Sequence, residues 1–113
     1  MNEVNTAALI IGPEGIVFIV LGLPLFQQRV LPNSWYGCRT TKSLSDKKIW
    51  YAVNRVTGKY MIVTGILVII SALVVFIFGA GMNPTYAAII LLAILVCATI
   101  GVVVNSIRTL KHL

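Results

Sequence analysis

The chain has 113 residues, of which 58% are hydrophobic and only 11% are charged, and its mean hydropathy is +0.96. Soluble domains carry about 25% charged residues, so this composition excludes an ordinary soluble protein and predicts an integral membrane protein with room for three spans of about 20 residues. The net charge of +6 comes from basic residues beside apolar segments, which favours anionic lipid over nucleic acid as the direct partner.

The first predicted span covers about residues 7–29 and ends at Arg29, whose side chain can reach the membrane interface. Pro13 and Pro24 interrupt this span, and each removes a backbone donor. We therefore expect a long, kinked helix, which a membrane tolerates when neighbours satisfy the freed groups. The alternative is a shorter helix in which Pro13 is the first residue.

The environment of Glu14 depends on where this helix begins. In the longer helix Glu14 lies inside the bilayer, where a carboxylate costs about 2.5–3.5 kcal/mol on insertion scales. It would then be protonated or paired, and a candidate for cation or proton handling. In the shorter helix Glu14 lies in a wet first turn, where the helix dipole favours it. We expect the interfacial position.

The polar part of the chain is the segment between the first two spans, residues 30–59, which holds six of the nine basic residues. Ser45 or Asp46 predicts a helix start. From there, apolar residues recur with helical spacing, at Ile49, Ala52, Val53 and Val56. The opposite arc carries polar and basic residues, which are Lys47, Lys48, Tyr51, Asn54 and Arg55.

This pattern predicts an amphipathic helix that lies along the inner headgroup region, with Trp50 at its edge. Each basic residue near an anionic surface contributes about 1 kcal/mol of attraction. The basic side chains expected to face lipid headgroups are Lys47, Lys48, Arg55 and Lys59. Gly58 permits a bend from this helix into the next span.

Residues 32–41 contain turn-forming residues, two aromatic side chains and one guanidinium, but no amphipathic periodicity. A membrane anchor does not need these residue types, so this segment is a candidate for a further function. The run Asn33-Ser-Trp-Tyr-Gly-Cys-Arg-Thr40 is followed by Ser43-Leu44, Trp50-x-x-x-Asn54-Arg55 and Gly58. This combination resembles the signature of the SdpI family, bacterial membrane proteins named for immunity to the sporulation-delaying peptide toxin. The positions that match the family motif are Gly37, Arg39, Thr40, Trp50 and Asn54.

The resemblance implies an immunity or signalling protein of the bacterial cytoplasmic membrane. It implies two partners, a membrane-active peptide toxin and a cytoplasmic regulator such as a DNA-binding repressor captured at the membrane. The motif positions would then bind a ligand or partner. No cofactor is implied.

Arg39 is the motif residue whose chemistry is most suggestive, since its fork can bind a carboxylate, a lipid phosphate or helix-end carbonyls. Trp50 and Asn54 are four residues apart and share one helical face. A guanidinium over Trp50 would make a cation–π contact. The alternative is that these residues fix the loop onto the membrane and bind no foreign ligand.

The second predicted span, about residues 60–79, carries small residues at a spacing of seven, which stays on one helical face with slow drift. Such faces let membrane helices approach closely. The helix-packing positions are Gly58, Gly65, Ala72 and Gly79. Gly15 and Gly22 in the first span have the same spacing and are a candidate complement. A second copy of the chain could use the same face, and we expect a homo-oligomer.

A short uncharged turn follows, in which Asn83 can cap the third span with Pro84 at its first helical position. The third span covers about residues 85–105. With three spans, all nine basic residues lie on one side of the membrane, which the positive-inside rule makes cytoplasmic. The N-terminus is then outside, and residues 30–59 and the C-terminus are in the cytoplasm.

The predicted fold is therefore an all-α membrane protein with three transmembrane helices and an interfacial amphipathic helix between the first and second. The alternative to immunity is a small channel or transporter that uses Glu14 and the small-residue stripe of the second span. We do not expect an enzyme, because no metal-ligand set, Ser–His or Cys–His pair, or facing carboxylates are recognisable. Cys38 and Cys97 are expected to be free thiols.

Overall fold

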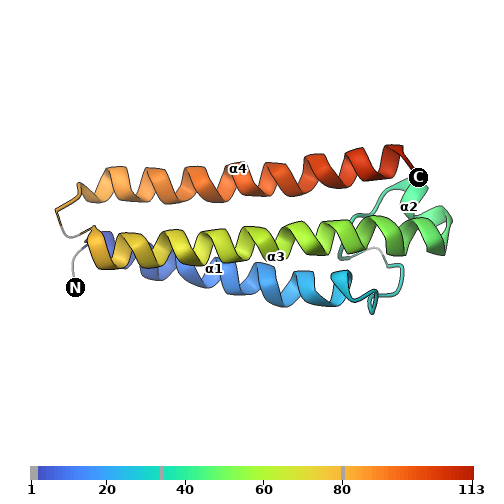
Figure 1. Cartoon of the computed structure of the whole chain (residues 1–113), viewed down its shortest axis with the longest axis horizontal. Helices are drawn as coiled ribbons and strands as arrows, with labels where there is room; N and C mark the ends of the chain where they lie inside the picture. Colours follow the sequence, from blue (N-terminus) through green and yellow to red (C-terminus); the bar gives the residue numbers. More distant parts are fainter. Residues whose placement is uncertain (1–2, 34, 80) are drawn as a thin grey trace.

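The computed structural model describes residues 3–33, 35–79 and 81–113, and these residues form four helices (Figure 1). Three are long: α1 (Glu3–Phe26), α3 (Lys47–Phe78) and α4 (Pro84–Lys111). The fourth, α2 (Thr41–Ser45), is short. Each long helix contains a segment long and apolar enough to cross a membrane. The predicted class, an all-α membrane protein with three spanning helices, is confirmed.

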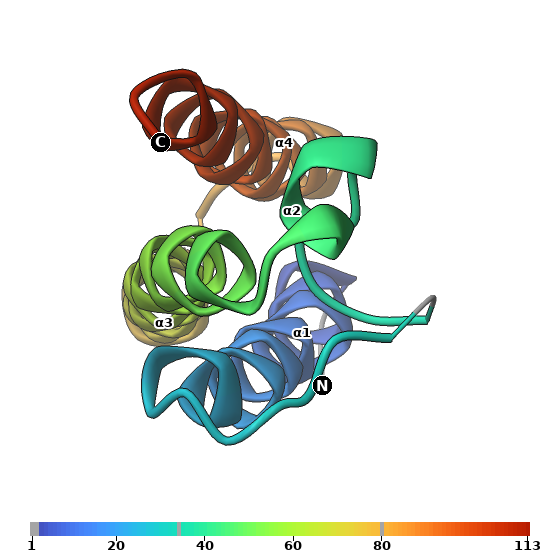
Figure 2. The same cartoon turned by 90° about the vertical axis from the view of Figure 1, so that its right-hand side faces the viewer.

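The long helix α3 lies between α1 and α4, and the molecule extends 52 Å along the helix axes (Figures 1 and 2). The α1–α3 loop, α2 and the C-terminus lie together at one end. The short α3–α4 turn lies at the other. All nine Lys and Arg residues belong to segments near the first end. We call this first end, with its loop and α2, the basic head.

Helix starts follow the predicted capping residues. Asp46 caps α3, and its carboxylate accepts a hydrogen bond from the Lys48 backbone N–H at 2.8 Å. Asn83 caps α4 with Pro84 in the first turn. In α1, Pro13 is an interior residue rather than the first one. The expectation of the longer first helix is confirmed, and the alternative start at Pro13 is wrong.

The helix predicted to begin at Asp46 is present, but the bend predicted at Gly58 is wrong. α3 continues without interruption for 32 residues, about 48 Å at 1.5 Å per residue. A hydrocarbon core is only about 30 Å thick, so the first turns of α3 extend beyond it. These turns and α2 therefore occupy the place expected of the interfacial helix.

Gly58 is used for close approach of two helices instead of a bend. A Cβ at Gly58 would come within 2.5 Å of the Phe26 backbone nitrogen, so no side chain fits there. The same close approach occurs at Gly65, seven residues further along α3. There, a Cβ on Gly15 of α1 would lie 2.5 Å from the Gly65 carbonyl oxygen. The glycines that repeat every seven residues on α3 thus pair with Gly15 and Gly22 on α1, as their common spacing predicts.

The same stripe also contacts α4 through its hydroxyls. The Thr57 and Ser106 hydroxyl oxygens are 2.6 Å apart, and both residues are buried. Thr64 donates to the Ala98 carbonyl at 3.5 Å. Threonines therefore face α4 while the adjacent glycines face α1, so this stripe joins α3 to both of its neighbours.

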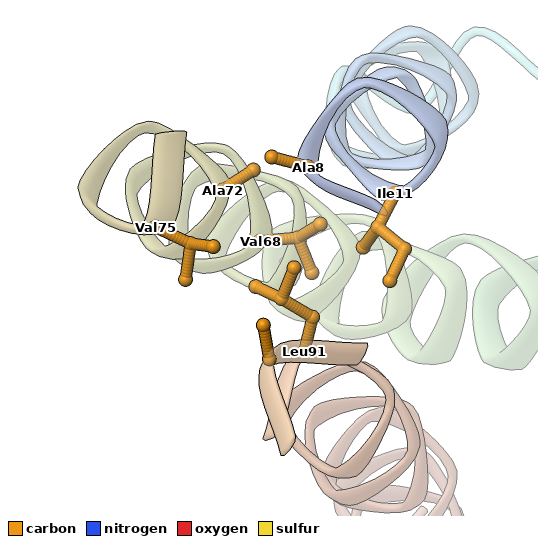
Figure 3. Packing of buried hydrophobic residues seen from close by; sticks show 7 residues of the cluster. Ala8, Ile11, Val68, Ala72, Val75 and Leu91 are labelled. Atoms are coloured by element: carbon orange, nitrogen blue, oxygen red, sulfur yellow. The ribbon is translucent and has the colours of Figure 1, made fainter. Parts of the chain in front are cut away.

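An apolar cluster closes the bundle at the end away from the basic head (Figure 3). Ala72, another predicted packing position, lies in it beside Gly12 of α1, where an added Cβ would be 3.5 Å away. Gly79 is buried at the C-terminus of α3, where its N–H donates to the Val75 carbonyl. The cluster consists of Ala8, Ile11, Val68, Ala72, Val75, Ala87 and Leu91.

Candidate functional site

The family-motif residues meet in the basic head, around the side chain of Asn54. This side chain is only 2% exposed. Its Oδ1 accepts a hydrogen bond from the Cys38 backbone N–H at 2.6 Å, and its Nδ2 donates to the Trp50 carbonyl at 3.0 Å. Asn54 was expected on the solvated arc of the helix. That expectation is wrong, because the amide satisfies backbone groups of a loop 16 residues away.

Gly37 makes this arrangement possible in two ways. Its φ of +99° lies in a region that side-chain-bearing residues avoid. A Cβ at this position would also come within 2.5 Å of Asn54 Oδ1. The loop can therefore approach α3 closely enough for the Cys38 N–H to reach Asn54.

Thr40 and Ser43 hold the other side of the loop through a reciprocal capping box at the start of α2. Ser43 N–H donates to Thr40 Oγ1 at 3.0 Å, and Thr40 N–H donates to Ser43 Oγ at 2.8 Å. Ser43 Oγ also donates to the Cys38 carbonyl at 2.8 Å. Ser43 is fully buried, yet the sequence interpretation did not include it among the site residues. Its position three residues after Thr40 was the available signal.

Trp50 completes the set, and its predicted place at the edge of the helix is wrong. The indole is 0% exposed, and its Nε1–H donates to the Val30 carbonyl at 2.8 Å. We refer to the residues that hold the loop in this way as the loop clamp. Its members are Val30, Gly37, Cys38, Thr40, Ser43, Trp50 and Asn54.

Trp35, in contrast, is 85% exposed, and Leu31 on the same loop is 70% exposed. An indole exposed near the ends of membrane helices is typical of the headgroup region. The two tryptophans therefore differ: Trp50 is buried and holds the loop, whereas we expect the exposed Trp35 to contact the membrane interface.

This difference predicts the fluorescence of the two tryptophans in liposomes. With Trp50→Phe, the remaining Trp35 emission should be strongly quenched by lipids brominated near the headgroup. With Trp35→Phe, the remaining Trp50 emission should be quenched several-fold less, because packed protein surrounds the indole. Equal quenching of both variants would contradict this assignment.

Basic side chains surround the loop clamp. Those of Lys47, Lys48, Arg55 and Lys59 are exposed, as their predicted contact with headgroups requires. The Arg55 guanidinium also lies over the Phe26 ring at 5.3 Å, and the Lys59 ammonium lies 5.9 Å from the Tyr60 ring centre. Lys42 Nζ donates to the Leu110 carbonyl at 2.8 Å, which ties α2 to the C-terminus of α4.

Among the five motif positions, all of which the structure describes, Arg39 is the exposed one. Gly37 and Thr40 are half-buried, and Trp50 and Asn54 are buried. Four of the five motif residues therefore have a structural role, which is to hold the loop against α3.

Cys38 contributes its backbone rather than its thiol to the loop clamp. Burial raises the pKa of the Cys38 thiol above its ordinary value, so the thiol stays protonated near neutral pH. Burial likewise raises the pKa of Tyr36, whose hydroxyl has no hydrogen-bond partner in the part of the chain that the structure describes. Cys38 and Cys97 are both free thiols.

Glu14 lies well inside α1 and within its candidate span, which begins at Thr6. The expected place in a first helical turn is wrong, because the helix begins at Glu3. Glu14 is far from the basic head, and its exposed side chain faces a groove beside α4.

Within the described residues, no group of three or more His, Cys, Asp or Glu side chains could hold a metal ion.

The fold and the basic head define a class of small multi-pass membrane protein in which one loop is held by a buried Trp–Asn–Ser set. The sequence model of the SdpI/YfhL protein family matches residues 29–106, and the chain belongs to this family. The matched region contains the whole loop clamp and excludes all of α1, Glu14 included.

The chain is similar to YfhL of Bacillus subtilis (strain 168), a protein described as uncharacterized. The two are 36% identical over 56 residues, which is 48% of this chain and 50% of YfhL. The aligned region thus spans about half the length of that relative. No solved structure matches the chain.

Proposed function

We propose that this chain is an immunity protein of the SdpI type, which protects the membrane around it from a membrane-active peptide. Its family and its three membrane-spanning helices support a membrane protein of this type. The observation that carries the finer proposal is that Arg39 is exposed on a loop that is held against α3 by hydrogen bonds to Trp50 and Asn54. The guanidinium group of an exposed arginine suits recognition of a carboxylate or phosphate.

We further propose that the basic head lies in the cytoplasm of a bacterium and contacts anionic lipid there. The gathering of all nine Lys and Arg residues toward one end supports this orientation through the positive-inside rule. A cytoplasmic regulator would dock on the same head, and the N-terminus would be outside. A second copy of the chain remains a proposed partner.

Transport by a channel receives less support from the structure. That function would require the small-residue stripe of α3 to line a polar path. Instead, Gly58 and Gly65 are packed against α1, while the hydroxyls of Thr57 and Thr64 bond to α4. The stripe is used for helix packing, which favours immunity over conduction.

The proposal predicts that Arg39→Ala removes protection without lowering the amount of protein. Cells lacking the gene are complemented with each variant and challenged with the strain's own membrane-active peptides, and membrane potential and survival are measured. Because Arg39 is exposed, the change in unfolding free energy should stay within about 1 kcal/mol, the usual range for an exposed charged side chain. Arg39→Lys should restore part of the protection, since it keeps the charge but loses the fork.

Two results would count against the proposed function. One is full protection by Arg39→Ala at normal protein level. The other is a deletion strain that is no more sensitive to any peptide than its parent. Loss of protection together with loss of the protein would instead indicate a purely structural role for Arg39.

A further inference from the structure

A groove of about 340 Å³ lies between α1 and α4 and opens to the side of the bundle. Both helices pack on α3, on different sides of it (Figure 2). The walls are apolar except for the carboxylate of Glu14 on α1 and the hydroxyl of Thr99 on α4. The lining residues are Glu14, Phe18, Leu95, Val96, Thr99 and Ile100.

The depth of Glu14 makes this groove unusual. Glu14 is eight residues from Thr6 and twelve from Phe26, which bound the candidate span. At 1.5 Å per residue it lies about 12 Å from one end of that span and about 18 Å from the other. An ionisable side chain at this depth is expensive unless it is neutralised or paired, and such residues are usually functional.

The chain itself offers little positive charge at this depth. α1 contains no Lys or Arg. The last basic residue of α3 is Lys59, six residues before Gly65, which packs on Gly15. The first basic residue of α4 is Arg108, nine residues beyond Thr99. The Thr99 hydroxyl donates to the Leu95 carbonyl of its own helix at 2.7 Å. A positive charge that pairs with the Glu14 carboxylate would therefore come from outside the bundle, through the open side of the groove.

We propose that this groove binds a lipophilic organic cation, an amine or quaternary ammonium on an apolar body, which enters from the lipid. The ammonium pairs with the Glu14 carboxylate, and the apolar body lies against Phe18, Leu95 and Ile100. The volume falls within the range of about 300–1,000 Å³ found for small-molecule sites. This site is separate from the loop clamp and does not depend on the proposed immunity function.

The test uses the full chain in liposomes of neutral phosphatidylcholine and a dodecyltrimethylammonium probe with a photoreactive diazirine in its alkyl chain. After irradiation, mass spectrometry should place the label on residues 14–18 and 95–100. Excess dodecyltrimethylammonium should lower this labelling about tenfold or more, whereas uncharged dodecanol should barely change it, because charge pairing is strong in a low-dielectric site.

Glu14→Gln should reduce the labelling about as much as the charged competitor does, since it keeps the shape and removes the charge. Asp46→Asn is the matched control: it removes one carboxylate at the other end of the bundle and still caps α3. It should leave the labelling unchanged.

Equal competition by dodecanol would overturn the proposal and indicate an apolar groove with a protonated Glu14. Unchanged labelling of Glu14→Gln, or label spread evenly over all lipid-facing helices, would overturn it as well. The competition between charged and uncharged probes needs only the unmodified chain, so it decides the question even if Glu14→Gln fails to fold.

Discussion

Gly58→Val is expected to prevent α1 from packing on α3 and to lower the free energy of unfolding by about 3 kcal/mol or more. The first added carbon would meet the Gly22 carbonyl oxygen, the Phe26 backbone nitrogen and, at 2.9 Å, Leu25 Cβ. Two of these three atoms are backbone, so they cannot rotate away. The measurement is the midpoint of unfolding in mixed micelles with increasing sodium dodecyl sulfate.

Gly101→Val provides the matched control for this change. Gly101 is also in a helix long and apolar enough to span a membrane. Apart from its chain neighbours and the nearby backbone of its own helix, no atom of the described residues lies within 4 Å of a Cβ built on it. The same substitution there should shift stability by no more than about 0.5 kcal/mol. Equal losses at both positions would show that helix propensity, rather than contact between α1 and α3, explains the effect.

Trp50→Ala should have an effect of similar size, with a loss of about 3–5 kcal/mol, which is usual for removing a buried aromatic side chain. The indole is fully buried, and its removal also leaves the Val30 carbonyl without its donor. The loop should detach from α3, and proteolysis between residues 30 and 40 should become faster. The measurements are the same unfolding midpoint and the rate of cleavage by trypsin.

Two further variants separate packing from hydrogen bonding at this position. Trp50→Phe keeps most of the apolar volume and should lose about 1–3 kcal/mol for the unsatisfied carbonyl. Trp35→Ala removes an indole that is 85% exposed and should leave the unfolding midpoint in micelles nearly unchanged. A large loss for Trp35→Ala would mean that the exposed loop, and not the loop clamp, stabilises the basic head.

These expectations also affect how mutations in the family motif should be interpreted. Substitutions at Gly37, Trp50 or Asn54 disturb the loop clamp, so loss of protection in such variants would not identify a binding residue. Arg39 is the exposed motif position, so the Arg39→Ala variant, with its protein level measured, is the one best suited to separating a functional defect from a folding defect. The structure thus divides the motif into a part that builds the loop and a residue that the loop presents.

The sequence alone determined the class of the protein, the start of two helices and the pairing of two glycine stripes. These features are local or periodic. A membrane span is recognised by about 20 consecutive apolar residues. The caps at Asp46 and Asn83 are recognised because each side chain lies within one turn of the backbone groups that it satisfies. The glycine faces are recognised by their repeat of seven residues. Each is encoded in neighbouring residues of the chain.

Only the tertiary structure decided which tryptophan is buried, where Asn54 points and whether α3 bends at Gly58. Helical periodicity places Asn54 on the polar arc, but the arc is covered by a loop whose Cys38 lies 16 residues earlier in the chain. Gly58 permits either a bend or a close contact, and the presence of α1 selects the contact. Burial depends on what another segment places against a surface, and no local pattern contains that information.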